Sequence, residues 1–167
     1  MEAQNLGLAP LYVRSGSRSY KVASADDVLE VARAVIGQRM QRGAAFSDPQ
    51  TAKAFFRDKL GGLEREVFAA AFLDTRHRPI EYMELFHGTI DGAEVHPREV
   101  VRHALRCNAA AVIVAHNHPS GSEEPSAADR AVTARLRQSL ALVDVRLIDH
   151  VVVGGLKTVT LAERGWL

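Results

Sequence analysis

Apolar and polar positions along the chain predict a protein of alternating helices and strands. Two runs, Val67–Asp74 and Ala109–Ala115, are apolar at both parities, which indicates strands buried on both faces of a sheet. Four amphipathic helices with apolar residues at 3.6-residue spacing are expected to begin at Ser24, Pro49, Pro97 and Ser126. Further strands are expected at 79–86, 143–148, 151–153 and 158–161. Helices alternating with mixed strands predict an α/β fold, a three-layer α/β/α sandwich.

The chain is expected to divide near residue 45. Residues 1–45 are predicted to form an N-terminal arm and a helix, and residues 46–167 the main domain. Ser24 and Asp27 have the spacing of a capping box, and Gly43 is expected to end the helix that follows them. This helix could pack on the main domain or bind a partner, and its sequence favours neither.

Composition excludes several classes of protein. Hydrophobic residues are 47% and charged residues 25% of the 167, as in soluble globular domains. The 21 basic and 20 acidic residues leave a net charge of +1, which argues against strong independent DNA binding. No apolar run has the length of a membrane span and no signal-peptide pattern is present, so we expect a cytoplasmic protein. The single cysteine, Cys107, excludes an internal disulfide and a Cys-rich zinc finger.

The candidate chemistry lies where the second apolar run meets the next helix. His116 and His118 are two residues apart, so an extended chain directs both imidazoles to one side and Asn117 to the other. Proline and glycine then predict a turn, and Asp129 falls in the first turn of the helix that Ser126 opens. Two imidazoles and one carboxylate are the ligands of a catalytic zinc site, with a fourth position for water.

Each part of this pattern also has an interpretation without metal. Ser126 and Asp129 fit a capping box, and a His-x-His sequence at a strand end is often a solvated loop. The combination of strand end, turn and carboxylate favours metal binding. The two interpretations are also compatible, because Ser126 could cap the helix while Asp129 binds the ion.

The motif resembles that of a known superfamily. His116-x-His118, Ser126 eight residues later and Asp129 three further resemble the JAMM motif of MPN/JAB metalloprotease domains. The string His-Asn-His-Pro-Ser-Gly resembles the bacterial RadC branch, and the similarity extends over about residues 46–167. The resemblance implies a cytidine-deaminase-like fold with a mixed sheet. It also implies Zn²⁺ held by His116, His118 and Asp129.

Glu66 is the candidate general base. Hydrolysis at zinc needs a base beside the bound water, and Glu66 directly precedes the apolar run that starts at Val67. The resemblance implies the same role for Glu66, and a Ser126 hydroxyl that stabilises the oxyanion. Glu64 is a close competitor, and a solvated charge at a strand start is the other interpretation. Glu66 can meet His116 only if their strands run antiparallel or are offset.

The implied function is a zinc-dependent hydrolase that cleaves a peptide or isopeptide bond in a polypeptide or amide substrate that the sequence does not identify. A non-catalytic MPN module that binds a peptide or partner is one alternative. A DNA-repair-associated accessory protein is another, suggested only by the name of the branch. The pair Asp149-His150 is predicted to form a turn between strands, with a place in the outer shell of the site as the alternative. The sequence predicts no oligomeric state.

Overall fold

The computed structural model describes residues 10–14, 19–41, 45–88 and 95–167, and these form two compact units, Met1–Gln38 and Arg39–Leu167. The first unit contains the antiparallel strands β1 (Tyr12–Arg14) and β2 (Tyr20–Val22) and most of α1 (Ala25–Gln41). The strand pair adds structure to a segment predicted only as an arm. The helix end expected at Gly43 lies outside the described residues.

Helix α1 begins with the predicted capping box. The backbone N–H of Asp27 donates to Ser24 Oγ at 3.1 Å, and the Ser24 N–H donates to Asp27 Oδ2 at 2.9 Å. The hydrogen bond from the Ser24 backbone, followed by the one from its side chain, lowers the pKa of Asp27 to about 2. The carboxylate is therefore charged at neutral pH, which suits the N-terminus of a helix.

The second unit is built on a five-stranded mixed sheet with the order β4-β3-β5-β6-β7. Only β5 and β6 pair in parallel, and the other neighbours are antiparallel. The strands are β3 (Val67–Leu73), β4 (Pro79–His87), β5 (Ala111–Asn117), β6 (Arg146–Gly154) and β7 (Lys157–Thr160). The two apolar runs of the sequence are thus the neighbouring strands β3 and β5 in the middle of the sheet.

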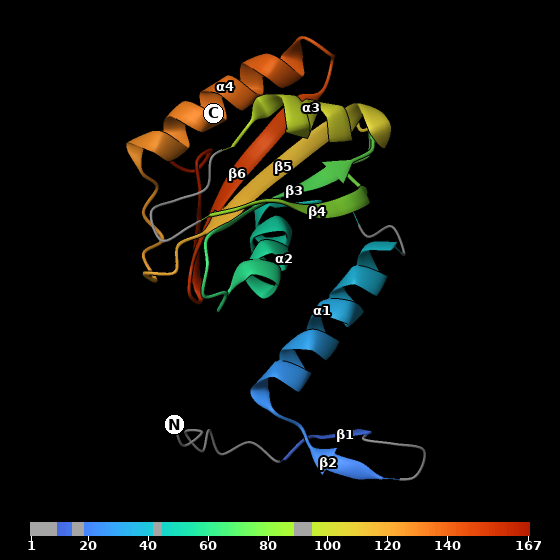
Figure 1. The fold of residues 1–167 in the computed structure, drawn as a ribbon. Helices are drawn as coiled ribbons and strands as arrows, with labels where there is room; N and C mark the ends of the chain where they lie inside the picture. Colours follow the sequence, from blue (N-terminus) through green and yellow to red (C-terminus); the bar gives the residue numbers. More distant parts are fainter. Residues whose placement is uncertain (1–9, 15–18, 42–44, 89–94) are drawn as a thin grey trace. The chain divides into compact units, whose positions relative to one another are not determined.

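Helices cover both faces of this sheet, as Figure 1 shows. Helix α2 (Pro49–Leu60) lies against one face, and α3 (Pro97–Arg106) and α4 (Ala127–Ala141) lie against the other. The arrangement confirms the predicted three-layer α/β/α sandwich. Within the described ranges, no helix combines the length and the apolar character needed to cross a membrane.

The main core lies between the sheet and helices α3 and α4. Every residue of β3 and β5 is buried, because a strand in the middle of a covered sheet has no exposed face. Alternate residues of both strands pack with α3 and α4 residues in one hydrophobic cluster, which includes Phe68, Phe72, Val112, Val114, Val100, Ala104, Leu136 and Leu140. His116 continues the same parity beyond Val114, so its side chain emerges on the α4 side of the sheet.

The turn predicted at Asp149-His150 is wrong. Strand β6 runs without a break through both residues, and both side chains are buried. Leu147 pairs with Val112 and Asp149 with Ile113, which leaves Ile148 as the extra residue of a β-bulge. The bulge changes the parity of the strand, so that His150 turns toward α4 and the end of β5.

Candidate metal centre

Strand alternation brings the two motif histidines together. His116 lies at the end of β5, and His118 follows it after one residue, with the two Nε2 atoms 2.9 Å apart. The backbone N–H of His118 donates to the Val153 carbonyl of β6 at 2.8 Å, which extends the sheet pairing past the end of β5. The two imidazoles therefore face one point from a rigid strand end.

The loop after His118 fixes the orientation of its ring. Gly121, with φ +82°, donates its N–H to the His118 carbonyl at 3.0 Å and so closes a tight turn. The next residues fold back so that His118 Nδ1 lies 2.9 Å from the Ser122 carbonyl. A carbonyl only accepts hydrogen bonds, so Nδ1 carries the proton and Nε2 keeps a lone pair for a cation. Gly154 of β6 permits this packing, because a Cβ there would collide with the backbone at Glu123.

Asp129 faces the histidines from the first turn of α4. One oxygen, Oδ2, accepts hydrogen bonds of 2.6 Å from both the backbone N–H and the hydroxyl of Ser126, in the expected capping box. The other, Oδ1, lies 3.2 Å from His116 Nε2. Burial raises the pKa of Asp129, but a proton on His116 Nε2, where one is present, and the Ser126 hydrogen bonds outweigh it and hold the pKa well below 3.8. The Asp129 carboxylate therefore takes part in the helix cap and also lies where a metal ligand would be.

The three side chains have the spacing of ligands around one small cation. The separations are 2.9 Å between the two histidine Nε2 atoms, 3.2 Å from His116 Nε2 to Asp129 Oδ1, and 3.7 Å from His118 Nε2 to Asp129 Oδ2. Ligand atoms about 2.0–2.1 Å from a tetrahedral zinc ion lie about 3.3 Å from one another. Since the observed separations lie on both sides of this value, the three residues could hold a metal ion.

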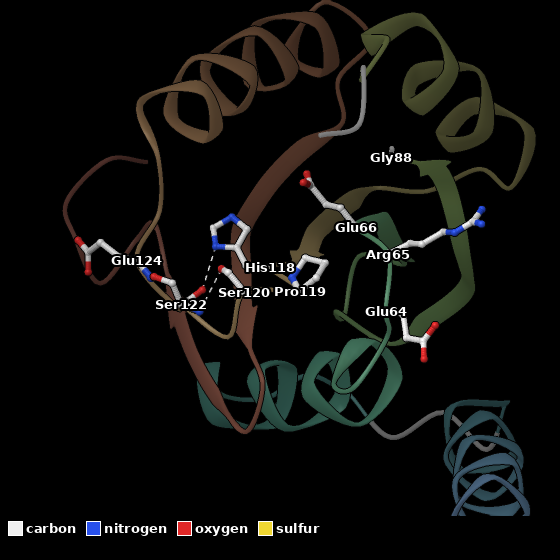
Figure 2. Close-up of a pocket in the computed structure, with 9 residues that line it drawn as sticks. All are labelled: Glu64, Arg65, Glu66, Gly88, His118, Pro119, Ser120, Ser122 and Glu124. Atoms are coloured by element: carbon white, nitrogen blue, oxygen red, sulfur yellow. Dashed lines mark hydrogen bonds between the residues drawn. The ribbon is translucent and has the colours of Figure 1, made fainter. Parts of the chain in front are cut away.

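Glu66 opens on the same cavity as His118. Strands β3 and β5 are antiparallel with Phe68 paired to His116, so Glu66 lies two residues before one partner and His118 two residues after the other. Both line a cavity of about 690 Å³, which Glu64 and Arg65 also line. In Figure 2 the Glu66 side chain points to the side of His118, whereas Glu64 and Arg65 point away from it. The antiparallel pairing that the candidate base requires is therefore present, and the geometry favours Glu66 over Glu64.

The hydroxyl of Ser126 contacts Asp129 and does not face the cavity. Its hydroxyl donates to Asp129 and accepts the Asp129 backbone N–H at 3.1 Å. The residues that line the cavity do not include it. In this arrangement Ser126 orients a candidate ligand, and a contact with substrate would require its hydroxyl to turn away from Asp129.

Asn117 has a role that the sequence did not reveal. Its side chain is buried on the face of the strand opposite to the histidines. There its Oδ1 accepts the Val67 N–H at 2.8 Å, and its Nδ2 donates to the Arg65 carbonyl at 2.9 Å. These bonds hold the backbone on both sides of Glu66. A buried amide within an apolar strand was the available signal, but its partners lie 50 residues away.

Comparisons with known proteins identify the family of this chain. A UPF0758 protein of Xylella fastidiosa (strain 9a5c) is 53% identical over the whole chain, which covers 70% of that protein. UPF0758 proteins of Xanthomonas campestris pv. campestris (strain 8004) and Xanthomonas oryzae pv. oryzae (strain PXO99A) are 59% and 60% identical over 139 residues. These matches cover 83% of this chain and 62% of each Xanthomonas protein, so the chain spans under two thirds of their length. The family model of the RadC-like JAB domain matches residues 46–166, and the chain therefore belongs to the RadC-like JAB domain family.

Proposed function

We propose that this chain is a zinc-dependent hydrolase that cleaves a peptide or isopeptide bond in a polypeptide or related amide substrate. The observation that carries the proposal is the single cavity lined by both His118, a candidate ligand, and Glu66, a candidate base. Membership of the RadC-like JAB family supports it, since the motif residues match those of JAMM metalloproteases.

The ion would be held by His116, His118 and Asp129, which offer ligand atoms that all lie within 4.8 Å of one another. Two imidazoles and one carboxylate leave the fourth position open, as in other catalytic zinc sites. When bound, zinc supplies a Lewis acid that lowers the pKa of a coordinated water from 15.7 to about 7 and polarises the carbonyl of the substrate.

Glu66 would act as general base and general acid. Its side chain is half-buried at the wall of the cavity, where it can reach both solvent and a bound amide. It accepts a proton from the attacking water and then returns that proton to the leaving amine. Asn117 supports this step, because its hydrogen bonds hold the backbone on both sides of Glu66.

Ser126 would complete the site as a donor to the oxyanion, the role that the family motif implies. Its hydroxyl is bonded to Asp129 in this structure, so the proposal requires it to rotate toward the carbonyl oxygen of the substrate. The cavity volume of about 690 Å³ falls within the range of about 300–1,000 Å³ that is typical of ligand sites. That size suits the residues around one scissile bond of a longer chain.

Hydrolysis of peptide and isopeptide substrate panels by zinc-loaded protein tests this function, with Glu66→Gln compared to Glu64→Gln. We expect Glu66→Gln to keep its zinc and to lose on the order of 100-fold to 10,000-fold in kcat. Glu64→Gln, a matched change two residues away, should leave kcat unchanged. Equal activity of Glu66→Gln and wild type would contradict the assignment of the base. Absence of hydrolysis by zinc-loaded wild type would favour a binding module instead.

A further inference from the structure

A run of buried hydrogen bonds connects His116 through two further side chains to the backbone of Asp129. His116 Nδ1 lies 2.8 Å from His150 Nε2, and His150 Nδ1 lies 2.6 Å from the hydroxyl of Thr133 on α4. That hydroxyl in turn donates to the backbone carbonyl of Asp129. The side chains of His116, His150 and Thr133 are 1%, 0% and 1% exposed, so solvent supplies no alternative partners. The run therefore joins one candidate ligand to the backbone of another.

The proton positions in this run depend on which acceptor receives the Thr133 hydroxyl proton. Thr133 Oγ1 lies within hydrogen-bond distance of the Asp129 carbonyl, and a threonine hydroxyl commonly donates to the carbonyl four residues earlier in a helix. Thr133 Oγ1 must then accept from His150, which places a proton on His150 Nδ1. In a neutral imidazole the other nitrogen is an acceptor, so His116 Nδ1 donates to His150 Nε2. The lone pair of His116 Nε2 is left facing His118 and Asp129.

One competing arrangement turns the Thr133 hydroxyl to His150 Nδ1, which places the His116 proton on Nε2 and removes the lone pair that a metal ion needs. The other competing arrangement places a positive charge on His150. Its two nitrogens would then both donate, and His116 would carry its proton on Nε2, toward Asp129. Desolvation opposes this, because His150 is fully buried and its ring nitrogens face an imidazole and a hydroxyl. The arrangement with Nδ1 protons on both histidines is therefore the one that avoids a buried charge and keeps the Nε2 lone pair of His116 available to a metal ion.

The β-bulge in β6 places His150 where it contacts His116 and Thr133. Without the bulge at Ile148, Leu147 and His150 could not both face α4, because they are three residues apart in β6. The side chain of Asp149 accepts the His150 N–H at 2.7 Å and the Ala162 N–H at 3.2 Å, which ties the backbone beside the bulge to the segment after β7. His150 is thus set in place by strand pairing on both sides.

We propose that His150 and Thr133 are positioning residues that fix the Nδ1–H form of His116, so that His116 presents its Nε2 lone pair to the metal ion. This inference rests on the proposed metal site, but it makes a separate claim about where the protons lie. Partners of this kind orient ligands in other metal sites, and their removal typically lowers metal affinity 10-fold to 100-fold.

Imidazole ¹⁵N spectra of the wild-type chain test the proton positions directly. We expect His116 and His150 both to carry their protons on Nδ1, with zinc added and without it, at about pH 8, above the usual imidazole pKa of about 6.5. A proton on Nε2 of either histidine would overturn the inference. The measurement without zinc needs no metal binding, so it separates a failure of this inference from a failure of the proposed function.

Zinc affinity of Thr133 variants, measured by competition with a chelator, tests the consequence. Thr133→Val keeps the shape of the side chain but loses the hydroxyl, and it should lower affinity 10-fold to 100-fold, whereas Thr133→Ser should restore most of it. Ser139→Ala is the matched control, because Ser139 makes the same bond to the carbonyl four residues earlier in α4 but contacts no imidazole. Wild-type affinity in a folded Thr133→Val protein, or equal losses in Thr133→Val and Ser139→Ala, would contradict the proposed positioning role.

Discussion

The side chain of Asn117 on β5 accepts the backbone N–H of Val67 on β3 at 2.8 Å, directly beside Glu66. Because Asn117 lies between His116 and His118, one tripeptide directs two candidate ligands to one side of the sheet and anchors the candidate base from the other. The register of β3 against β5 therefore sets the distance between ligands and base.

Asn117→Ala should loosen the backbone on both sides of Glu66. The change leaves the Val67 N–H and the Arg65 carbonyl without their partner, so we expect the free energy of unfolding in urea to fall by about 1–3 kcal/mol. Hydrolysis should fall more than zinc content does, since the affected backbone carries Glu66 and not a ligand. Equal losses of zinc and activity would show that Asn117 acts through the histidines.

Gly154→Ala should disturb the loop that orients His118. A Cβ at Gly154 would displace the backbone at Ser122, whose carbonyl accepts the His118 Nδ1 proton. We expect weaker zinc binding, measured by chelator competition. Gly165→Ala is a control for a glycine-to-alanine change away from this loop, because nothing lies near its Cβ position. Unchanged zinc affinity in Gly154→Ala would mean that the loop does not position His118.

Ser126→Ala separates capping from catalysis. Loss of the cap should cost about 1 kcal/mol in the free energy of unfolding. If Ser126 also donates to the oxyanion, kcat at saturating zinc should fall on the order of 100-fold to 1,000-fold. We predict both losses. A stability loss with unchanged kcat would restrict Ser126 to holding Asp129.

Acid should weaken the β3–β4 turn through Asp74. Hydrogen bonds from Arg78, first from its backbone N–H and then from its side chain, outweigh desolvation and hold the pKa of Asp74 below 3.8 in the folded chain. A lowered folded-state pKa gives stability that is present above about pH 3.8 and is lost as the pH falls through the folded value. Urea unfolding from about pH 7 to pH 2 should show this loss in wild type and less of it in Asp74→Asn. Parallel pH profiles would contradict it.

Local patterns predicted much of the site. Alternation along an extended strand placed His116 and His118 on one side, and the serine-to-aspartate spacing placed Asp129 in the first turn of a helix. Both are short-range properties that a sequence displays directly. The antiparallel pairing of β3 with β5 was recognised as a requirement for Glu66, but only the structure shows it.

The missed residues depend on long-range register. Asp149-His150 resembled a turn because two polar residues interrupt an apolar run, and the bulge that buries them depends on pairing with β5. The break expected between the strands at 151–153 and 158–161 is present, because Gly155 with φ +61° joins β6 to β7. His150 and Asn117 acquire their roles only from partners on other elements, which no local pattern reveals.

The most direct test of the account is the zinc content of the purified chain, wild type beside His118→Ala, by elemental analysis. We predict about one zinc per chain in wild type and none in the variant, since a three-residue site that loses one ligand loses its metal. Zinc absent from both proteins, or retained equally by both, would contradict the proposal that His116, His118 and Asp129 form a metal centre.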